Sequence, residues 1–251
     1  MTTKPEDIIF YKKNGYAVFN EFFNDEFCND IKIHLEKFIK NVLPQIPSNR
    51  VYYDDINNKN SLKQIQKIFE YDPFFYDLIH KNEIYELAEQ LLDEKPSVIN
   101  LQYFNKVPLH SKPTPPHQDG YYFKIKPMKA ITLWLALDDV NESNGGIQYY
   151  SGSHQKGLRN HFRSGVLGFS QSLPLDDSIL MDSEKIRPCC QAGTLLAHDA
   201  LMMHSADKNQ SNLPRRSLGF IYYGSSVEIS EKEASEYQKK LDDELIKKGL
   251  V

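Results

Sequence analysis

Ile131-Thr132-Leu133-Trp134-Leu135-Ala136-Leu137 has the length and the β-branched and aromatic content of a buried strand. Similar short runs occupy residues 98–104, 147–150, 193–197 and 218–223. Loops, not long helical patterns, separate these runs, which favours an antiparallel double-sheet barrel over βαβ units. We therefore expect a mainly β protein whose barrel core covers about residues 97–226.

Helices are expected on both sides of this core. About the first 96 residues are predicted to be mainly helical and to pack outside the barrel, although residues 15–19 resemble a short strand. Asn24, followed by two acidic residues, is a plausible N-cap for an amphipathic helix through Leu43.

Residues 44–60 are polar and predict a loop, whereas helical spacing returns at residues 61–70 and 83–92. A capping-box pattern at Ser230-x-x-Glu233 predicts a C-terminal helix over about 230–247. One stripe of that helix carries Ala234, Tyr237, Leu241 and Leu245. We expect one domain, residues 1–251.

Composition limits the functional classes. The formal net charge is −4 over 251 residues, so the basic surface typical of nucleic-acid binding is not expected. The polar start shows neither a secretory signal nor a membrane span. Cys28, Cys189 and Cys190 lack zinc spacing and are expected to be reduced thiols. These features predict a cytoplasmic monomer or homodimer without nucleic-acid or membrane partners.

A candidate metal motif lies at His117-Gln118-Asp119. Two neutral imidazoles and one carboxylate bind one face of Fe(II) and leave positions open for a co-substrate and O2. Residues i and i+2 of a strand share a face, and a third ligand can come from any distance. The spacing alone is weak, because composition predicts about one such pair by chance. A second such pair, His34-x-Glu36, lies in a helical pattern. Its two side chains would point roughly 200° apart and could not bind one metal ion.

Arg215 comes 11 residues after His204, at the start of a predicted strand. A guanidinium matches a carboxylate with two parallel hydrogen bonds, so it could hold the far end of an anionic co-substrate that chelates the metal. Arg216 would point to the opposite face of the strand. The alternative role for Arg215 is a structural salt bridge.

In order and spacing, several segments together resemble the phytanoyl-CoA dioxygenase family of Fe(II)/2-oxoglutarate-dependent oxygenases. The matching segments are Gly15-Tyr16-Ala17-Val18, Asp72-Pro73-Phe74-Phe75, Pro116-His117-Gln118-Asp119, Leu133-Trp134-Leu135-Ala136-Leu137-Asp138-Asp139, Asn144-Gly145-Gly146, Ser151-Gly152-Ser153-His154, and His204 with Asn209 and Arg215. The resemblance implies a double-stranded β-helix, a jelly-roll or cupin-like barrel.

The resemblance also implies a ligand set. His117, Asp119 and His204 would bind Fe(II), with 2-oxoglutarate and O2 as co-substrates and ascorbate as a possible stimulant. Arg215 would hold the distal carboxylate of 2-oxoglutarate. Further co-substrate contacts would come from Gln102, Trp134 and Lys63, together with Thr132, which shares a face with Trp134. One departure is Ala206, where many members place a small hydroxyl residue.

The expected activity is hydroxylation of an unactivated C–H bond in a small organic molecule, with release of succinate and CO2. Two alternatives stay open: a cupin-like metal enzyme that does not use 2-oxoglutarate, and a non-catalytic module that binds 2-oxoglutarate or metal. Residues 158–188 lack sustained periodicity, so this segment is either a lid or an ordinary surface insertion.

Overall fold

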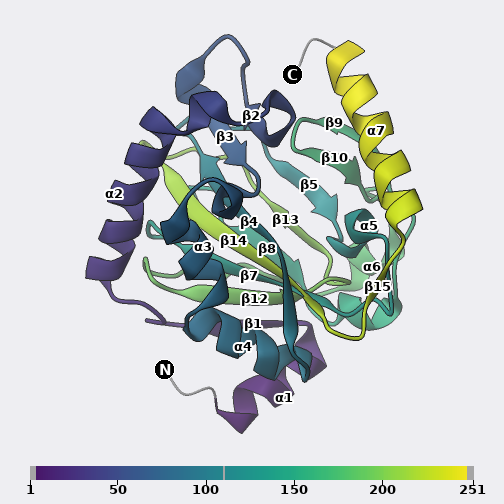
Figure 1. Ribbon diagram of the computed structural model, residues 1–251. Coiled ribbons are helices and arrows are strands. Elements are labelled where there is room, and N and C mark those ends of the chain that lie inside the picture. The colour runs from purple at the N-terminus through teal and green to yellow at the C-terminus, as the bar shows by residue number, and fades with distance from the viewer. Residues whose placement is uncertain (1–3, 110, 248–251) are drawn as a thin grey trace.

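Two antiparallel sheets form the centre of the molecule (Figure 1). The computed structural model describes residues 4–109 and 111–247. The seven-stranded sheet has the order β1 (Tyr16–Phe19), β12 (Leu195–Asp199), β7 (Ala130–Ala136), β14 (Arg215–Gly224), β4 (Pro96–Lys106), β3 (Leu62–Ile65), β2 (Val51–Tyr53). The four-stranded sheet has the order β11 (Lys185–Ile186), β8 (Ile147–Tyr150), β13 (His204–Ala206), β5 (Thr114–His117).

The outer face of the seven-stranded sheet is covered by helices (Figure 1). Alternation along β7 sends Leu133 and Leu135 into the core that this face shares with α2 (Asp25–Asn41), α3 (Pro73–His80) and α4 (Glu83–Leu92). Thr132 and Trp134 consequently point to the opposite, inner face. The inner face is therefore free to contribute polar side chains to a site.

Two of the covering helices, α2 and α4, begin where the sequence predicts. The Asn24 side chain accepts a hydrogen bond from the Phe27 backbone N–H at 2.9 Å, which caps α2. Asn82 caps α4 in the same way, so the helix predicted at residues 83–92 is confirmed. The remaining helices are α1 (Pro5–Asn14), α5 (Gly120–Phe123), α6 (Ser178–Asp182), α7 (Glu231–Lys247) and the 3-10 turns η1 (Leu43–Gln45), η2 (Ser48–Arg50), η3 (Lys59–Ser61), η4 (Ile68–Glu70), η5 (Ser153–Lys156).

The helix predicted at residues 61–70 is wrong. This segment forms β3 and then η4. All four residues of β3 are buried, so the strand does not need alternating apolar residues, and the spacing of Leu62, Ile65 and Ile68 does not distinguish it from a helix. Residues 44–60, predicted as a loop, contain β2, which pairs with β3. Together with β1, these strands make the first 96 residues part of the seven-stranded sheet and not only an outer helical layer.

The segment 158–188 contains the hairpin β9 (Phe162–Val166) and β10 (Phe169–Ser172), then α6 and β11. The C-terminal helix α7 lies beside this hairpin (Figure 1), and Ser170 Oγ is 2.8 Å from the Tyr237 hydroxyl. Ala234, Tyr237 and Leu241 of the predicted stripe face the cavity described below, whereas the Leu245 side chain lies outside the described residues. The last strands, β6 (Ile125–Lys126) and β15 (Glu228–Ile229), pair with each other.

The expectation of a mainly β protein with helices is confirmed, with one correction to its shape. Within residues 4–109 and 111–247, the paired strands leave both main sheets open, so hydrogen bonds do not close a barrel. The two sheets instead face each other across a cavity that both of them line. In the same part of the chain, none of the helices is both long and apolar enough to cross a bilayer.

Candidate functional site

Strand pairing brings His117 and His204 together although 86 other residues separate them in the sequence. His117 ends β5, His204 begins β13, and the two residues are register partners. Their ring centroids lie 4.2 Å apart, and both side chains are buried. The four-stranded sheet thus presents two imidazoles to the cavity.

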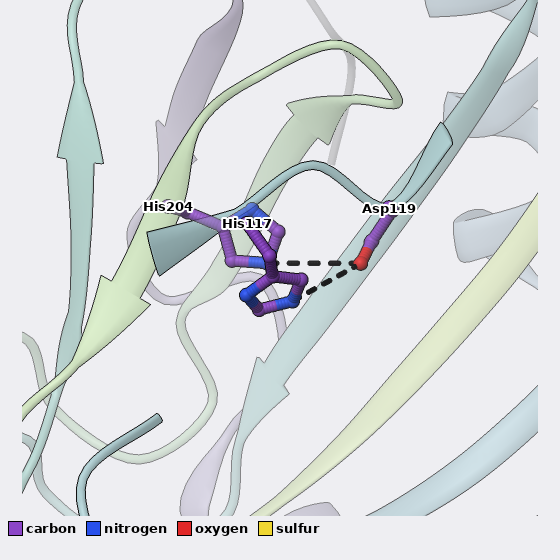
Figure 2. Close-up of side chains that lie close together, drawn as sticks. All are labelled: His117, Asp119 and His204. Atoms are coloured by element: carbon purple, nitrogen blue, oxygen red, sulfur yellow. Dashed lines mark ion pairs between the residues drawn. The ribbon is translucent and has the colours of Figure 1, made fainter. Parts of the chain in front are cut away.

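Asp119 completes the group (Figure 2). Its Oδ1 lies 3.6 Å from His117 Nε2 and 3.7 Å from His204 Nε2. The sequence suggested that His117 and Asp119 share one face of a strand. This is wrong, because the strand ends at His117. Asp119 instead has helical dihedral angles (φ −59°, ψ −36°) at the start of α5, and this turn directs its carboxylate towards the imidazoles.

Backbone carbonyls fix the tautomers of both imidazoles. His117 Nδ1 donates to the Pro115 carbonyl at 2.8 Å, and His204 Nδ1 donates to the Met202 carbonyl at 3.0 Å. A neutral imidazole that donates from Nδ1 carries a free lone pair on Nε2. Both Nε2 atoms, which lie on the side of Asp119 Oδ1, are therefore available as metal ligands. A histidine that binds metal commonly donates its other ring N–H to a backbone carbonyl in this way.

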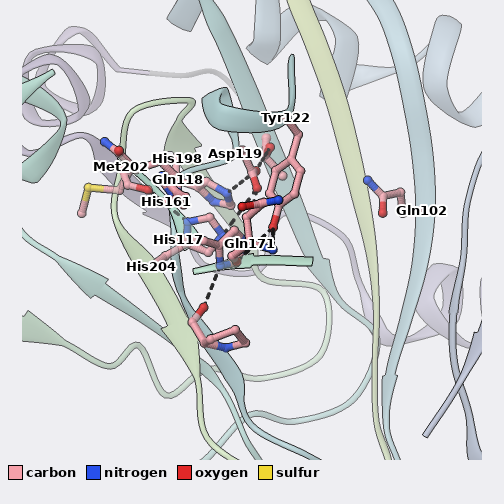
Figure 3. Close-up of polar contacts among 12 residues, drawn as sticks. Gln102, His117, Gln118, Asp119, Tyr122, His161, Gln171, His198, Met202 and His204 are labelled. Carbon is pink, nitrogen blue, oxygen red and sulfur yellow. Dashed lines mark hydrogen bonds and ion pairs between the residues drawn. The ribbon is translucent and has the colours of Figure 1, made fainter. Parts of the chain in front are cut away.

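The other carboxylate oxygen of Asp119 is held from the seven-stranded sheet (Figure 3). Thr132 Oγ1 donates to Oδ2 at 2.7 Å, and His198 Nε2 lies 3.2 Å from the same atom. The Tyr149 hydroxyl is 3.1 Å from His198 Nδ1. Sequence reasoning considered Thr132 only as a co-substrate contact and passed over His198. In the structure, these two residues orient the carboxylate so that Oδ1 alone faces the imidazoles.

Electrostatics also suit a divalent cation. Burial favours a raised pKa for Asp119, but the neighbouring imidazoles of His204, His117 and His198 outweigh it and hold the pKa of Asp119 well below its usual range. Burial, reinforced by the nearby His117 and His198, lowers the pKa of His204 well below its usual range. One carboxylate and neutral imidazoles are the forms that bind metal.

A further histidine supports the backbone between the two ligands. His161 Nε2 accepts a hydrogen bond from the Gln118 N–H at 3.0 Å, while His161 Nδ1 donates to the Arg159 carbonyl. The Gln118 side chain, fully buried, donates to the carbonyls of Gly157 and Leu201. The turn from His117 to Asp119 is thus fixed on several sides.

The seven-stranded sheet arranges the remaining candidates in rows on its inner face. Thr132, at the metal end, pairs with Ile221 of β14 and His198 of β12. In the next row, Gly219 lies between Trp134 of β7 and Gln102 of β4. A Cβ at Gly219 would lie 2.8 Å from the Phe104 ring, so a larger residue here would force that ring to move. At the far end, Arg215 pairs with Lys106.

Arg215 is a buried cation that faces this cavity. Its Nη1 donates to Ser217 Oγ at 3.0 Å, its guanidinium carbon lies 5.1 Å from the Trp134 ring centroid, and its buried Nε has no partner within the described residues. Burial lowers the pKa of Arg215 to about 10, so it stays charged at neutral pH. The neighbouring Arg216 instead forms two side-chain hydrogen bonds to Asp138, at 2.9 and 2.8 Å.

The other proposed co-substrate contacts all line the cavity, each with its own partners. Gln102 accepts a hydrogen bond from Gln64, and Figure 3 shows it well apart from the histidine cluster. Lys63 lies 3.7 Å from Asp54 and donates to the Leu167 carbonyl in the segment 158–188. Ala206, which lacks a hydroxyl, pairs across the strands with Thr114, and both side chains line the cavity.

The three side chains fit a first-row divalent ion. Their ligand atoms lie within 4.8 Å of one another. Two atoms that are each about 2.1 Å from one ion are at most about 4.2 Å apart, so both separations from Asp119 Oδ1 are compatible with a shared ion. Two neutral imidazoles and one carboxylate with open positions are the donor set that non-haem Fe(II) prefers.

Known proteins resemble this chain in fold and sequence. A curated phytanoyl-CoA dioxygenase from Arabidopsis thaliana is 29% identical over 59% of this chain and 52% of its own length. The chain thus spans about half the length of that relative. A phytanoyl-CoA dioxygenase domain-containing protein 1 homolog from Caenorhabditis briggsae is 21% identical and covers 91% of both chains.

Two solved structures illustrate the shared fold. The non-heme alpha ketoglutarate dependent carbocyclase SnoK from nogalamycin biosynthesis has a TM-score of 0.74 and 18% identity, covering 90% of this chain and 86% of SnoK. EctD from S. alaskensis, solved with 2-oxoglutarate and 5-hydroxyectoine, has a TM-score of 0.74 and 15% identity, covering 89% of this chain and 77% of EctD. The family model for Phytanoyl-CoA dioxygenase (PhyH) matches residues 11–217. This chain therefore belongs to the phytanoyl-CoA dioxygenase (PhyH) family.

Proposed function

We propose that this protein, as a single domain of residues 1–251, is an Fe(II)- and 2-oxoglutarate-dependent dioxygenase. It hydroxylates an unactivated C–H bond of a small organic molecule and releases succinate and CO2. The observation that carries the proposal is Arg215, a buried guanidinium that has no carboxylate partner among residues 4–109 and 111–247 and lies in the cavity that holds the His117, Asp119 and His204 triad. A buried cation of this kind requires an anion, and 2-oxoglutarate supplies one at its distal end.

In this proposal the residues have distinct tasks. His117, Asp119 and His204 hold Fe(II), which with 2-oxoglutarate and O2 supplies the oxidant for the C–H bond. Thr132 and His198 contact Asp119 Oδ2, so Oδ1 would be the oxygen available to the metal. The guanidinium of Arg215 forms paired hydrogen bonds to the distal carboxylate.

The row that contains Trp134 and Gln102 separates the metal end from the guanidinium, so these two residues would lie beside a co-substrate that spans both ends. Gly219, between these two residues, has no side chain and so leaves space above the sheet at this point. The three residues thus provide the surface on which 2-oxoglutarate is placed. This orientation leaves the metal end open towards the substrate.

The size and lining of the cavity support a small-molecule substrate. The whole cavity is about 540 Å³, within the range of small-ligand sites. Aromatic side chains line it, among them Tyr122, Phe123, Tyr223 and Tyr237. Lys67, which also lines it, already pairs with Glu70 at 3.2 Å. These features favour an uncharged substrate with ring faces over one that carries phosphates.

An anaerobic titration tests the co-substrates. Purified protein is loaded with Fe(II), 2-oxoglutarate is added, and the visible spectrum is followed for a metal-to-ligand charge-transfer band. Wild type is expected to form the band, and Arg215→Met is expected to need a much higher 2-oxoglutarate concentration. A metal enzyme that does not use 2-oxoglutarate would form no band and would keep its activity after Arg215→Met.

Turnover is tested by admitting O2 and measuring succinate with a panel of small ring-bearing molecules. Succinate that rises with one substrate, together with a product 16 mass units heavier, is the expected result of hydroxylation. Formation of the band without substrate-dependent succinate across the panel would favour a non-catalytic binding module. A product that has only lost hydrogen would contradict hydroxylation while leaving the oxygenase class in place.

A further inference from the structure

A buried lysine, Lys106, lies beside Arg215. Lys106 is the last residue of β4 and the register partner of Arg215 in β14. Directly opposed residues in an antiparallel pair point to the same face, so both side chains face the cavity, which both of them line. Each is only 4% exposed. Asn209 Nδ2 donates to the Lys106 carbonyl at 2.8 Å and fixes the end of the strand.

The Lys106 amino group has few partners. Its Nζ donates to the Lys112 carbonyl at 2.6 Å, although an ammonium has three N–H donors. Among the residues that the structure describes, no carboxylate oxygen lies within 4.0 Å of Lys106 Nζ. The nearby buried carboxylate, Asp54, is paired with Lys63 at 3.7 Å. This end of the cavity therefore has more basic side chains than acidic ones within the described residues.

We propose that Lys106 is a second contact for the distal carboxylate of 2-oxoglutarate and that it takes up a proton from solvent when the co-substrate binds. The inference rests on the function proposed above. The step is an acid–base reaction in which the amine lone pair accepts one proton, and the resulting ammonium forms a charge-assisted hydrogen bond to the carboxylate. Arg215 is charged with or without the co-substrate, whereas Lys106 becomes charged only when the co-substrate binds.

The surroundings of Lys106 support a neutral amine before binding. Burial, together with the positive charges of Arg215 and Lys63, lowers the pKa of Lys106 to about 6, whereas Asp54 and Asp207 act in the opposite direction. Above pH 6 the free protein therefore holds mostly the amine. A carboxylate placed beside it favours the ammonium and raises the pKa. Binding is then coupled to proton uptake over the pH range between the two pKa values.

Calorimetry measures this coupling. Fe(II)-loaded protein is titrated with 2-oxoglutarate without O2 at pH 7.5, in several buffers that differ in ionisation enthalpy. Wild type is expected to take up about one proton per co-substrate, and its Kd should rise by up to about tenfold per pH unit above pH 6. Lys106→Met should lose the uptake and bind about tenfold or more weakly. Lys106→Arg should bind well without uptake, because arginine stays protonated.

Two other lysine variants locate the proton. Lys67→Met removes another cavity-lining lysine, which is paired with Glu70, and is expected to leave the uptake unchanged. Lys63→Met tests the other buried lysine of this end. Uptake that persists in Lys106→Met, or that disappears only in Lys63→Met, would overturn the assignment.

The charge-transfer band separates the two proposals. A wild-type protein that forms the band but takes up no proton contradicts the role of Lys106 and leaves the proposed function intact. A wild-type protein that forms no band at any pH contradicts the proposed function itself. Circular dichroism of each variant shows whether a loss of binding reflects loss of the fold.

Discussion

The two ends of the cavity differ in how completely their charged groups are paired. At the metal end, Asp119 Oδ2 contacts Thr132 and His198, and both imidazoles of the triad donate to backbone carbonyls. At the other end, the buried Nε of Arg215 has no hydrogen-bond partner in the described part of the chain. The metal end is therefore assembled before any ligand arrives, whereas the cationic end is incomplete without an anion.

The two ends therefore have different roles: the metal end provides fixed geometry, and the cationic end provides affinity for the co-substrate. The metal end fixes geometry through hydrogen bonds that exist in the empty protein, which reduces the reorganisation needed on binding. The cationic end keeps buried charges that are costly until a carboxylate compensates them. Removal of a residue should consequently destabilise the site at the first end and can stabilise the empty protein at the second.

The largest effect is expected from His204→Ala. Loss of an outer hydrogen bond to a metal ligand typically weakens metal affinity about 10- to 100-fold, and loss of the ligand itself should exceed that range. Fe(II) binding, measured by calorimetry without O2, should fall by more than about 100-fold. The control is His34→Ala, which removes the histidine of the other His-x-Glu pattern, in α2. Equal effects of the two variants would exclude His204 as a ligand.

Arg215→Met should separate binding from stability. Truncating one partner of a buried charge pair costs about 2–5 kcal/mol, so the Kd of 2-oxoglutarate should rise roughly 30- to 5,000-fold. The empty protein should keep its Tm or gain stability, because an uncompensated buried cation is removed.

Arg216→Met provides the matched control on the opposite face of β14. It leaves Asp138 without its main partner and should lower stability by about 1–3 kcal/mol while 2-oxoglutarate affinity is retained. Thermal unfolding and calorimetry of both variants test the pair. A lower Tm for Arg215→Met together with unchanged affinity would reverse the comparison between the two ends.

Low pH should reduce the stability of the fold through His161, which supports the backbone between the two ligands. Burial lowers the pKa of His161 to about 4, whereas an unfolded histidine titrates near 6.5. Between these values only the unfolded chain binds the proton, so stability falls as the pH drops through this window, by up to about 3 kcal/mol. His161→Gln keeps an acceptor for the Gln118 N–H without the titration, and urea unfolding at pH 7 and pH 4.5 should show a smaller difference for it. Identical pH dependence in both proteins would contradict this role.

The smallest effect is expected from Thr132→Val, which preserves side-chain shape and removes the hydrogen bond to Asp119 Oδ2. Fe(II) affinity should fall about 10- to 100-fold. Thr114→Val makes the same chemical change near the cationic end and should leave Fe(II) affinity unchanged. If Thr132→Val binds Fe(II) like wild type, His198 alone is sufficient to orient the carboxylate.

The sequence predicted the residues whose order along the chain is informative. His117, Asp119, His204 and Arg215 were identified because several motifs occur in one order, and the structure brings all four to one cavity. Their roles as ligands stay a prediction. The helix at residues 61–70 was wrong because apolar spacing there fits two kinds of element.

Residues that depend on strand register could not be predicted in this way. His198 contacts Asp119 because β12 pairs with β7 so that His198 lies opposite Thr132, and nothing local in the sequence specifies that pairing. Lys106 had an available signal. Alternation from Gln102 through Phe104 places it on the same face, but the predicted strand ended at Phe104, two residues before β4 ends.

Two consecutive arginines create an ambiguity that the fold has to resolve. A slip of one residue in β14 would exchange Arg215 and Arg216 and turn every following side chain to the wrong face. Asp138 prevents this, because it accepts hydrogen bonds from the backbone N–H, Nε and Nη2 of Arg216, at 2.8, 2.9 and 2.8 Å. A partly buried ion pair thus selects which of two identical side chains enters the cavity, and Asp138 fixes the register of the whole strand.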